Sequence, residues 1–167
     1  MKEIKVGLGT CGISAGAKMV YNEFKDKLSQ NNLDIEVKQT GCMGMCYNEV
    51  LVEVVDNDES YLYSKVSPDN VEKIVNEHII GNHPVYEWIA TSRKNIEKDP
   101  FFKKQKRIVL QNCGIIDPGS IDDYILYDGY KAIKKALQKY SQLEVIDIVC
   151  NSGIRGRGGG GFPTGVK

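Results

Sequence analysis

No stretch of the sequence approaches 18 consecutive apolar residues, so it predicts no helix that could span a bilayer. An excess of charge of one sign is also missing, because 22 lysines and arginines balance 22 aspartates and glutamates. Without net charge, the chain has no general attraction toward nucleic acid or an anionic membrane. The first six residues also lack the apolar run of a signal peptide. We therefore expect a cytoplasmic protein that neither binds nucleic acid nor inserts into a membrane.

Histidine is scarce, with two residues, whereas cysteine occurs five times, at positions 11, 42, 46, 113 and 150. An odd number of cysteines in a chain without a leader argues against a framework of disulfides, because the cytosol keeps thiols reduced. The cysteines are therefore candidates for metal ligands, reactive thiols or small buried side chains.

The first part of the chain predicts alternating strands and helices. Strand patterns occur in four segments: 2–8, 33–37, 50–55 and 61–66. Residues 16–30 carry apolar side chains on one helical stripe. Ser67 and Pro68 predict the start of a second helix, which ends near Gly81. The order β-α-β-β-β-α predicts an α/β domain with a thioredoxin-like layout over residues 1–86.

The rest of the chain predicts helices and a loop. Periodicity fades over residues 87–107, which we interpret as a linker. Residues 108–167 then contain three helix starts, at Asp117, Asp128 and Ser141. The last helix is expected to bury its apolar residues between 143 and 149 and to end at Gly153. This segment is a helical lead-in to a second domain.

Three cysteines form the first candidate site. Cys42 and Cys46 make a C-x3-C pair on a glycine-rich loop, where two thiolates can reach one metal ion. Cys11 follows the first predicted strand, and in a thioredoxin layout its loop neighbours the C-x3-C loop. Other roles stay open, because Cys11 can be a small buried residue and the pair can form a redox disulfide. A zinc site completed by Cys113 or His78 also stays open.

These cysteines lie within longer matching motifs: Gly9-Thr10, Gly16-Ala17, Thr40-Gly41-Cys42-x-Gly44-x-Cys46 and Tyr63-x-x-Val66-x-Pro68. Together the motifs resemble the thioredoxin-like [2Fe–2S] ferredoxins that occur beside, or fused to, the flavin subunit of NADH dehydrogenases and NAD-linked hydrogenases. The resemblance implies a metal site at the three cysteines. That family usually has C-x-G-T-x-C in the first loop, where this sequence places Gly7 and Gly12 at the ligand positions. Such a cluster normally takes four ligands, so an unusual fourth ligand, another metal and a cluster-less module all remain open.

Residues 153–167 form the second candidate site. Seven glycines in this segment leave backbone amides bare and free to adopt positive φ, which suits close approach to phosphates and to a flat ring. Arg155, Arg157 and Lys167 add positive charge, and Phe162 offers an aromatic face. An RGG-type RNA-binding tract or a flexible linker is the alternative, but such tracts repeat and this one occurs once.

This whole segment resembles the FMN- and NADH-binding segment of the NADH dehydrogenase flavoprotein subunit. It reads Gly153-Ile154-Arg155-Gly156-Arg157-Gly158-Gly159-Gly160-Gly161-Phe162-Pro163-Thr164-Gly165-Val166-Lys167. By matching position, the resemblance implies that Gly156, Arg157, Gly158 and Lys167 line the FMN phosphate and ribityl chain. It implies contact with NADH for Gly159 and Phe162. The [4Fe–4S] cysteines of that family would lie beyond Lys167, so the chain is expected to be an amino-terminal fragment.

These resemblances imply a subunit of a soluble NAD(P)H-dependent oxidoreductase. Electrons would pass between NAD(P)H, FMN and the iron–sulfur centres of partner subunits in a hydrogenase, formate dehydrogenase or electron-bifurcating complex. No catalytic side chain is assigned, because the redox chemistry belongs to the cofactors. The alternative is a cluster-less docking module that only organises partner subunits. The fragment alone is expected to be inactive, because half of the flavin site is absent.

Overall fold

The computed structural model describes residues 2–57, 59–92 and 98–167. The chain divides into two compact units, Met1–Tyr124 and Ile125–Lys167. Within the described ranges, no helix is both long enough and apolar enough to cross a membrane.

The first unit is built on a five-stranded sheet with the order β2-β1-β3-β4-β5. Its strands are β1 (Lys2–Gly7), β2 (Glu36–Thr40), β3 (Val52–Asp56), β4 (Glu59–Tyr63) and β5 (Ile89–Ser92). β1 and β2 are parallel, as a crossover through a helix requires, and the other neighbours are antiparallel. The α/β class and the order β-α-β-β-β-α are confirmed.

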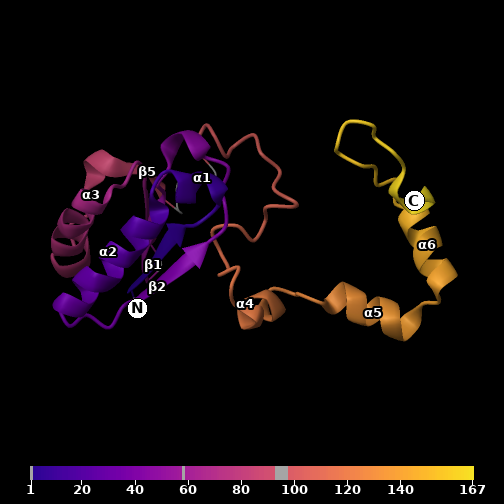
Figure 1. Ribbon diagram of the computed structural model, residues 1–167, viewed down its shortest axis with the longest axis horizontal. Helices are drawn as coiled ribbons and strands as arrows, with labels where there is room; N and C mark the ends of the chain where they lie inside the picture. The colour runs from indigo at the N-terminus through magenta and orange to yellow at the C-terminus, as the bar shows by residue number, and fades with distance from the viewer. Residues whose placement is uncertain (1, 58, 93–97) are drawn as a thin grey trace. The chain divides into compact units, whose positions relative to one another are not determined.

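One face of this sheet is covered by helices. α2 (Ala17–Gln30) and α3 (Pro68–Lys73) lie side by side (Figure 1), and α3 continues as the π-helix η2 (Ile74–Ile80). A short helix, α1 (Thr10–Ser14), precedes α2. The side chains between sheet and helices are almost entirely apolar and form the main core: Ile4, Val6, Val20, Phe24, Val52, Val54, Val71 and Ile74.

The opposite face of the sheet carries a second, smaller core. Leu62 of β4 packs there with Met45, Leu51 and Phe102. The chain beyond residue 98 therefore returns onto the sheet, and the ammonium of Lys5 donates to the carbonyl of Ile115 at 3.2 Å.

The segment 87–107, which the sequence predicts to be a linker, contributes a strand and a core side chain to this unit. It contains β5, which pairs antiparallel with β4, and the buried side chain of Phe102. β5 has only four residues and follows the short 3₁₀ turn η3 (Tyr86–Trp88), so its own sequence is too short to show a strand period. Pairing with β4 makes it a strand.

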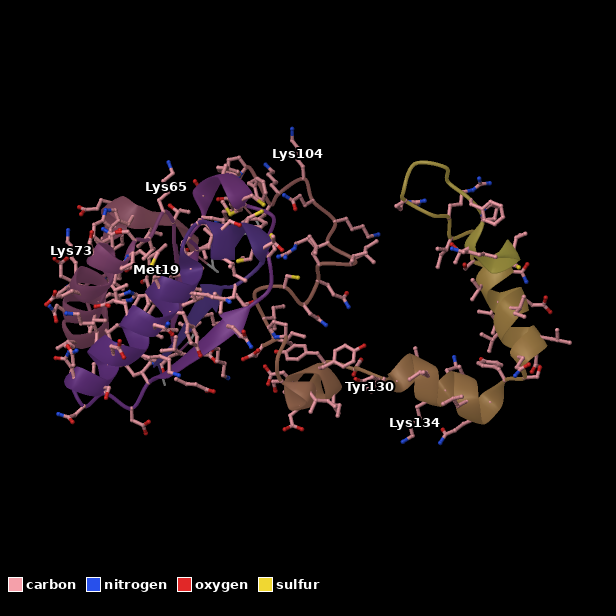
Figure 2. The ribbon with its side chains drawn as sticks, viewed as in Figure 1. Met19, Lys65, Lys73, Lys104, Tyr130 and Lys134 are labelled. Carbon is pink, nitrogen blue, oxygen red and sulfur yellow. The ribbon has the colours of Figure 1, made fainter. Side chains whose placement is uncertain are left out.

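The second unit is helical. α4 (Ile121–Leu126) crosses the division between the units, and α5 (Lys131–Lys139), α6 (Gln142–Asn151) and the 3₁₀ turn η5 (Thr164–Val166) follow. Ser141 caps α6 through a capping box with Glu144, as its residue type predicts. Tyr130 and Lys134 project from the start of α5 (Figure 2), and both are exposed.

The predicted burial of residues 143–149 is wrong. Leu143 is 75% exposed and Ile146 is 49% exposed. An apolar helix face becomes buried only when another element covers it. Among the described residues of this unit, η5 is the element with substantial contact to α6, and it leaves that face open.

Candidate functional site

The topology of the sheet brings the three candidate cysteines to one end of the first unit. β1 and β2 are parallel, so the loops that follow them leave the same edge. Cys11 lies in α1 after β1, whereas Cys42 follows β2 and Cys46 begins the 3₁₀ turn η1 (Cys46–Asn48). The two loops touch closely, since a Cβ added at Gly9 would lie 3.0 Å from the Cβ of Cys42.

Cys46 connects the three thiols. Its hydrogen bond with Cys11 is the largest influence on its pKa and raises it, while a hydrogen bond with Cys42 acts in the opposite direction. The amide of Gly44 also donates to the Cys42 sulfur at 3.3 Å. Cys11 and Cys46 are exposed and Cys42 is half-buried, so the alternative of Cys11 as a buried apolar residue is wrong.

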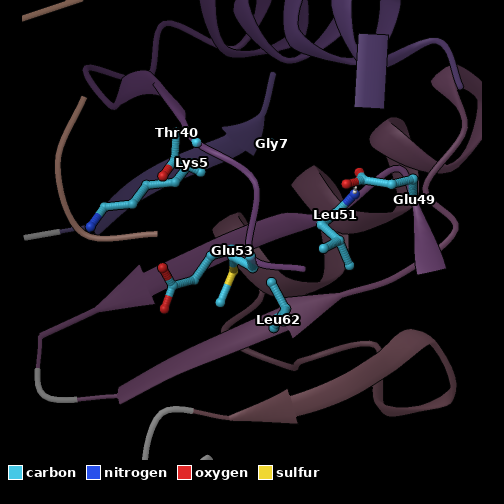
Figure 3. Close-up of a pocket in the computed structure, with 9 residues that line it drawn as sticks. Lys5, Gly7, Thr40, Glu49, Leu51, Glu53 and Leu62 are labelled. Atoms are coloured by element: carbon cyan, nitrogen blue, oxygen red, sulfur yellow. Dashed lines mark hydrogen bonds between the residues drawn. The ribbon is translucent and has the colours of Figure 1, made fainter. Parts of the chain in front are cut away.

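A carboxylate borders this cysteine cluster, and sequence reasoning missed it. Glu49 follows Cys46 by three residues, and its Oε2 accepts the amide of Leu51 at 3.1 Å (Figure 3). A Cβ added at Gly12 would lie 3.1 Å from this oxygen, and one added at Gly7 would lie 3.7 Å from it. The carboxylate therefore lies against the two glycines that stand at the family's ligand positions.

The donor types at this end of the sheet suit iron or zinc, because three thiols and a carboxylate can all become anionic ligands. Among the residues that the structure describes, however, no group of three or more His, Cys, Asp and Glu side chains is already arranged to hold a metal ion. Cys46 interacts with both Cys11 and Cys42, and metal binding would have to replace the thiol protons of its ligands.

The other residues considered for a metal site differ in position. The Nδ1 of His78 hydrogen-bonds to the hydroxyl of Tyr63 at 2.8 Å, and the ring is 2% exposed. His78 therefore has a packing role. Cys113 lies closer to the cluster, because a Cβ added at Gly41 would be 3.3 Å from its sulfur. The amide of Gly114 anchors this segment by donating to Thr40 Oγ1 at 2.9 Å.

The glycine-rich segment of the second unit forms a closed loop. The amide of Gly156 donates to the carbonyl of Phe162 at 2.9 Å, and the amide of Thr164 donates to the carbonyl of Ile154 at 3.0 Å. Arg155 pairs with Pro163 as an isolated β-bridge. These contacts fix the base of the loop, so the segment is an ordered turn in this structure.

The tip of this loop, residues 157–161, is open. A Cβ added at any glycine from 158 to 161 would meet no atom within 4 Å. Gly159 has φ +115° and Gly161 has φ +57°, which glycine adopts without strain. Among the described residues, the tip amides have no backbone acceptor, whereas the amide of Gly156 is already used.

The residues predicted to contact FMN or NADH differ in how accessible they are in the loop. Gly158 and Gly159 lie at the open tip, and Phe162 is 57% exposed beside it. The guanidinium of Arg157 folds back and donates to the carbonyls of Arg155 and Gly156 at 3.0 and 3.3 Å. A bound anion would have to draw this side chain outward.

Comparison with known proteins finds relatives among the subunits of oxidoreductases. The chain is 58% identical over 65 residues to HndC of the NADP-reducing hydrogenase of Solidesulfovibrio fructosivorans. It is 42% identical over 60 residues to a subunit of the NADH-quinone oxidoreductase of Rhizobium meliloti. It is also 31% identical over 84 residues to HndB of the Solidesulfovibrio enzyme, covering 49% of this chain and 67% of that protein. The chain belongs to the family of the NADP-reducing hydrogenase subunit HndB.

Coverage differs strongly among these relatives. The first two matches cover 39% and 36% of this hydrogenase-family chain, which spans only 13% of HndC and 14% of the Rhizobium protein. A thioredoxin-like [2Fe–2S] ferredoxin from Aquifex aeolicus matches in structure with a TM-score of 0.50 and 23% identity, over 56% of this chain and 93% of the ferredoxin. This likeness confirms the thioredoxin-like fold. No protein-family model matches the chain.

Proposed function

We propose that this chain forms the amino-terminal part of a flavoprotein subunit that passes electrons between NAD(P)H, FMN and iron–sulfur centres of partner subunits. Its family membership supports an oxidoreductase subunit. The observation that carries the flavin assignment is the loop 153–167, which is closed at its base and open at its tip. Cytoplasmic localisation and the domain boundaries 1–86, 87–107 and 108–167 remain predictions from the sequence.

The loop tip has the properties that a flavin phosphate requires. Most of its backbone amides belong to glycines, which have no side chain, so a phosphate oxygen can approach them closely. Arg157 and Lys167 would add charge-assisted contacts to the same phosphate. We therefore propose that Gly156, Arg157, Gly158 and Lys167 line the FMN phosphate and ribityl chain, and that the amide of Gly156, which is bonded to Phe162, positions the loop.

Two residues on the same loop are proposed to contact the nicotinamide cofactor. Phe162 exposes more than half of its surface beside the tip, where an aromatic ring can stack on a nicotinamide or adenine. Gly159 leaves room for that ring, because a Cβ there would meet nothing within 4 Å. When bound, FMN would supply the chemistry of accepting a hydride and releasing single electrons.

The partners of such a chain would be the other subunits of a hydrogenase, formate dehydrogenase or electron-bifurcating complex. The exposed apolar residues of α5 and α6 support this proposal, because such faces mark surfaces that another layer covers. [4Fe–4S] clusters would belong to sequence beyond Lys167 or to those partners.

Flavin binding by the longer polypeptide tests the proposal. FMN would be released by denaturation and quantified by fluorescence after purification with and without added FMN. We expect Arg157→Ala to weaken FMN binding at least tenfold, because it removes a charged contact to phosphate. Lys139→Ala, an exposed lysine at the end of α5, is the matched control and should bind FMN normally. A wild-type polypeptide that retains no FMN would overturn the proposal.

The second candidate function is a cluster-less docking module in the first unit. It is favoured by Gly7 and Gly12, which stand at the usual ligand positions of the first loop. Iron and acid-labile sulfide in anaerobically purified protein distinguish the two functions. A colourless protein with zinc or no metal supports docking, whereas a reducible [2Fe–2S] signal supports electron transfer.

A further inference from the structure

The Glu49 carboxylate lies where the first loop lacks a side chain. Its Oε2 is 3.1 Å from the position that a Cβ at Gly12 would take. That position cannot itself hold a side chain, because the same Cβ would lie 2.3 Å from the carbonyl oxygen of Gly7. The backbone of β1 and α1 is thus packed too closely for a thiol at position 12, and the space beside it is filled from the opposite loop.

Local structure holds Glu49 beside the cysteines. The carboxylate is half-buried and accepts the amide of Leu51, which fixes its direction at the start of β3. Figure 3 shows it bent back toward Leu51, at the same edge of the sheet as Gly7. Cys46 begins η1 and Glu49 directly follows this turn, so both groups belong to the same short segment of the chain.

We propose that Glu49 is the fourth ligand of a [2Fe–2S] cluster that Cys11, Cys42 and Cys46 hold with their thiolates. Binding would release the three thiol protons, and the carboxylate would bind iron through oxygen. Four anionic ligands give the same total ligand charge as four cysteines. The proposal rests on this end of the first unit and is independent of the flavin loop.

Cys113 is the competing fourth ligand. Its sulfur lies beside Gly41, next to Cys42, and it would complete a four-thiolate set. Position favours Glu49, because its carboxylate borders both glycines of the first loop, whereas Cys113 is placed by the segment anchored at Gly114.

The test uses the chain of residues 1–167, reconstituted anaerobically with ferrous iron and sulfide. Iron and acid-labile sulfide per chain, visible circular dichroism and the EPR spectrum of the reduced protein are measured. We expect about two irons and two sulfides per chain in the wild type. Glu49→Ala should lower both at least tenfold, while Glu49→Cys should retain both and change the dichroism and EPR spectra.

Matched variants control for folding and for the competing ligand. Glu72→Ala removes an exposed carboxylate on α3 and should leave the cluster unchanged, as should Cys113→Ser. Far-UV circular dichroism and thermal unfolding of Glu49→Ala should resemble the wild type. Should this variant be unfolded, Glu49→Gln gives the same comparison with the shape of the side chain preserved.

Three outcomes would overturn the proposal. In the first, Glu49→Ala and Glu49→Gln keep the iron content and spectra of the wild type. In the second, Cys113→Ser loses the cluster while the Glu49 variants keep it. In the third, the wild type takes up no iron and is isolated with zinc or with a Cys11–Cys46 disulfide. None of these outcomes affects FMN binding by the longer polypeptide, so the two proposals can fail separately.

Discussion

The hydroxyl of Tyr63 lies 2.8 Å from Nδ1 of His78, and both side chains are buried between the sheet and η2. The same hydroxyl accepts the amide of Val85 at 3.1 Å. With one proton and a second lone pair, the hydroxyl can accept this amide and still donate to Nδ1 of a neutral imidazole that carries its hydrogen on Nε2. One phenol thus joins β4, the π-helix and the segment before η3.

Tyr63→Phe should destabilise the first unit by about 2 kcal/mol, because it keeps the ring but leaves a buried amide and a buried imidazole nitrogen without a partner. Chemical denaturation followed by circular dichroism measures the change. Tyr61→Phe is the matched control, since its hydroxyl bonds to Glu59 near the surface and its removal should cost less than about 0.5 kcal/mol. Equal losses in the two variants would contradict the network.

Burial, and secondarily the charge of Lys2, lowers the pKa of His78 from 6.5 to about 4, with Asp56 acting in the opposite direction. The unfolded chain binds this proton more readily than the folded one between these two values. The free energy of unfolding should therefore be highest above pH 6.5 and fall by about 3 kcal/mol as the pH drops toward 4.

Denaturation at pH 7.0, 5.5 and 4.5 checks this dependence. His78→Gln should reduce the slope between these pH values, whatever its cost at pH 7. His83→Gln replaces an exposed histidine and should leave the slope unchanged. A wild-type slope that survives in His78→Gln would assign the dependence to another group.

Gly12→Ala should destabilise the first unit by about 2 kcal/mol. Alanine in a helix is favoured over glycine by about 1 kcal/mol, but the new Cβ would lie 2.3 Å from the Gly7 carbonyl oxygen, and relief of that overlap costs more. Gly158→Ala is the control, because its Cβ would meet nothing within 4 Å. Thermal unfolding of the two variants compares them directly, and a stabilised Gly12→Ala protein would refute the close approach.

Phe102→Ala should cost about 3 kcal/mol in the unfolding of the first unit, because the ring is 7% exposed and packs with Leu51 and Leu62. Phe162→Ala removes a ring that is 57% exposed, so its effect should stay below about 0.5 kcal/mol. The comparison also tests whether the chain beyond residue 98 belongs to the first folded unit. A negligible effect of Phe102→Ala would mean that this segment does not pack onto the sheet.

Much of the fold was predictable because its signals are local. The alternation of Ile4 and Val6, the Ser67–Pro68 helix start and the Ser141 cap each act within a few residues. β5 and the second core were not predictable in the same way. They depend on pairing with β4 and on Phe102 reaching Leu62, contacts between residues far apart in the sequence.

The candidate sites were also predictable only in their local features. The cysteine spacing and the glycine loop can be recognised in the sequence, because ligand type and backbone freedom are properties of single residues. Glu49 gave one usable signal, an acidic residue three positions after Cys46. Nothing in the sequence shows that its carboxylate turns back toward Gly7 and Gly12.

The sequence by itself determined the α/β order of the first unit, its helix caps and the residue types at both candidate sites, since each follows from periodicity or side-chain chemistry. Only the tertiary structure decided which loops meet. Parallel pairing of β1 with β2 brings Cys11 to Cys42 and Cys46, and the close packing of Gly12 on Gly7 leaves the adjacent space to Glu49. Such contacts depend on how segments far apart in the sequence pack together, and a local sequence pattern does not predict that packing.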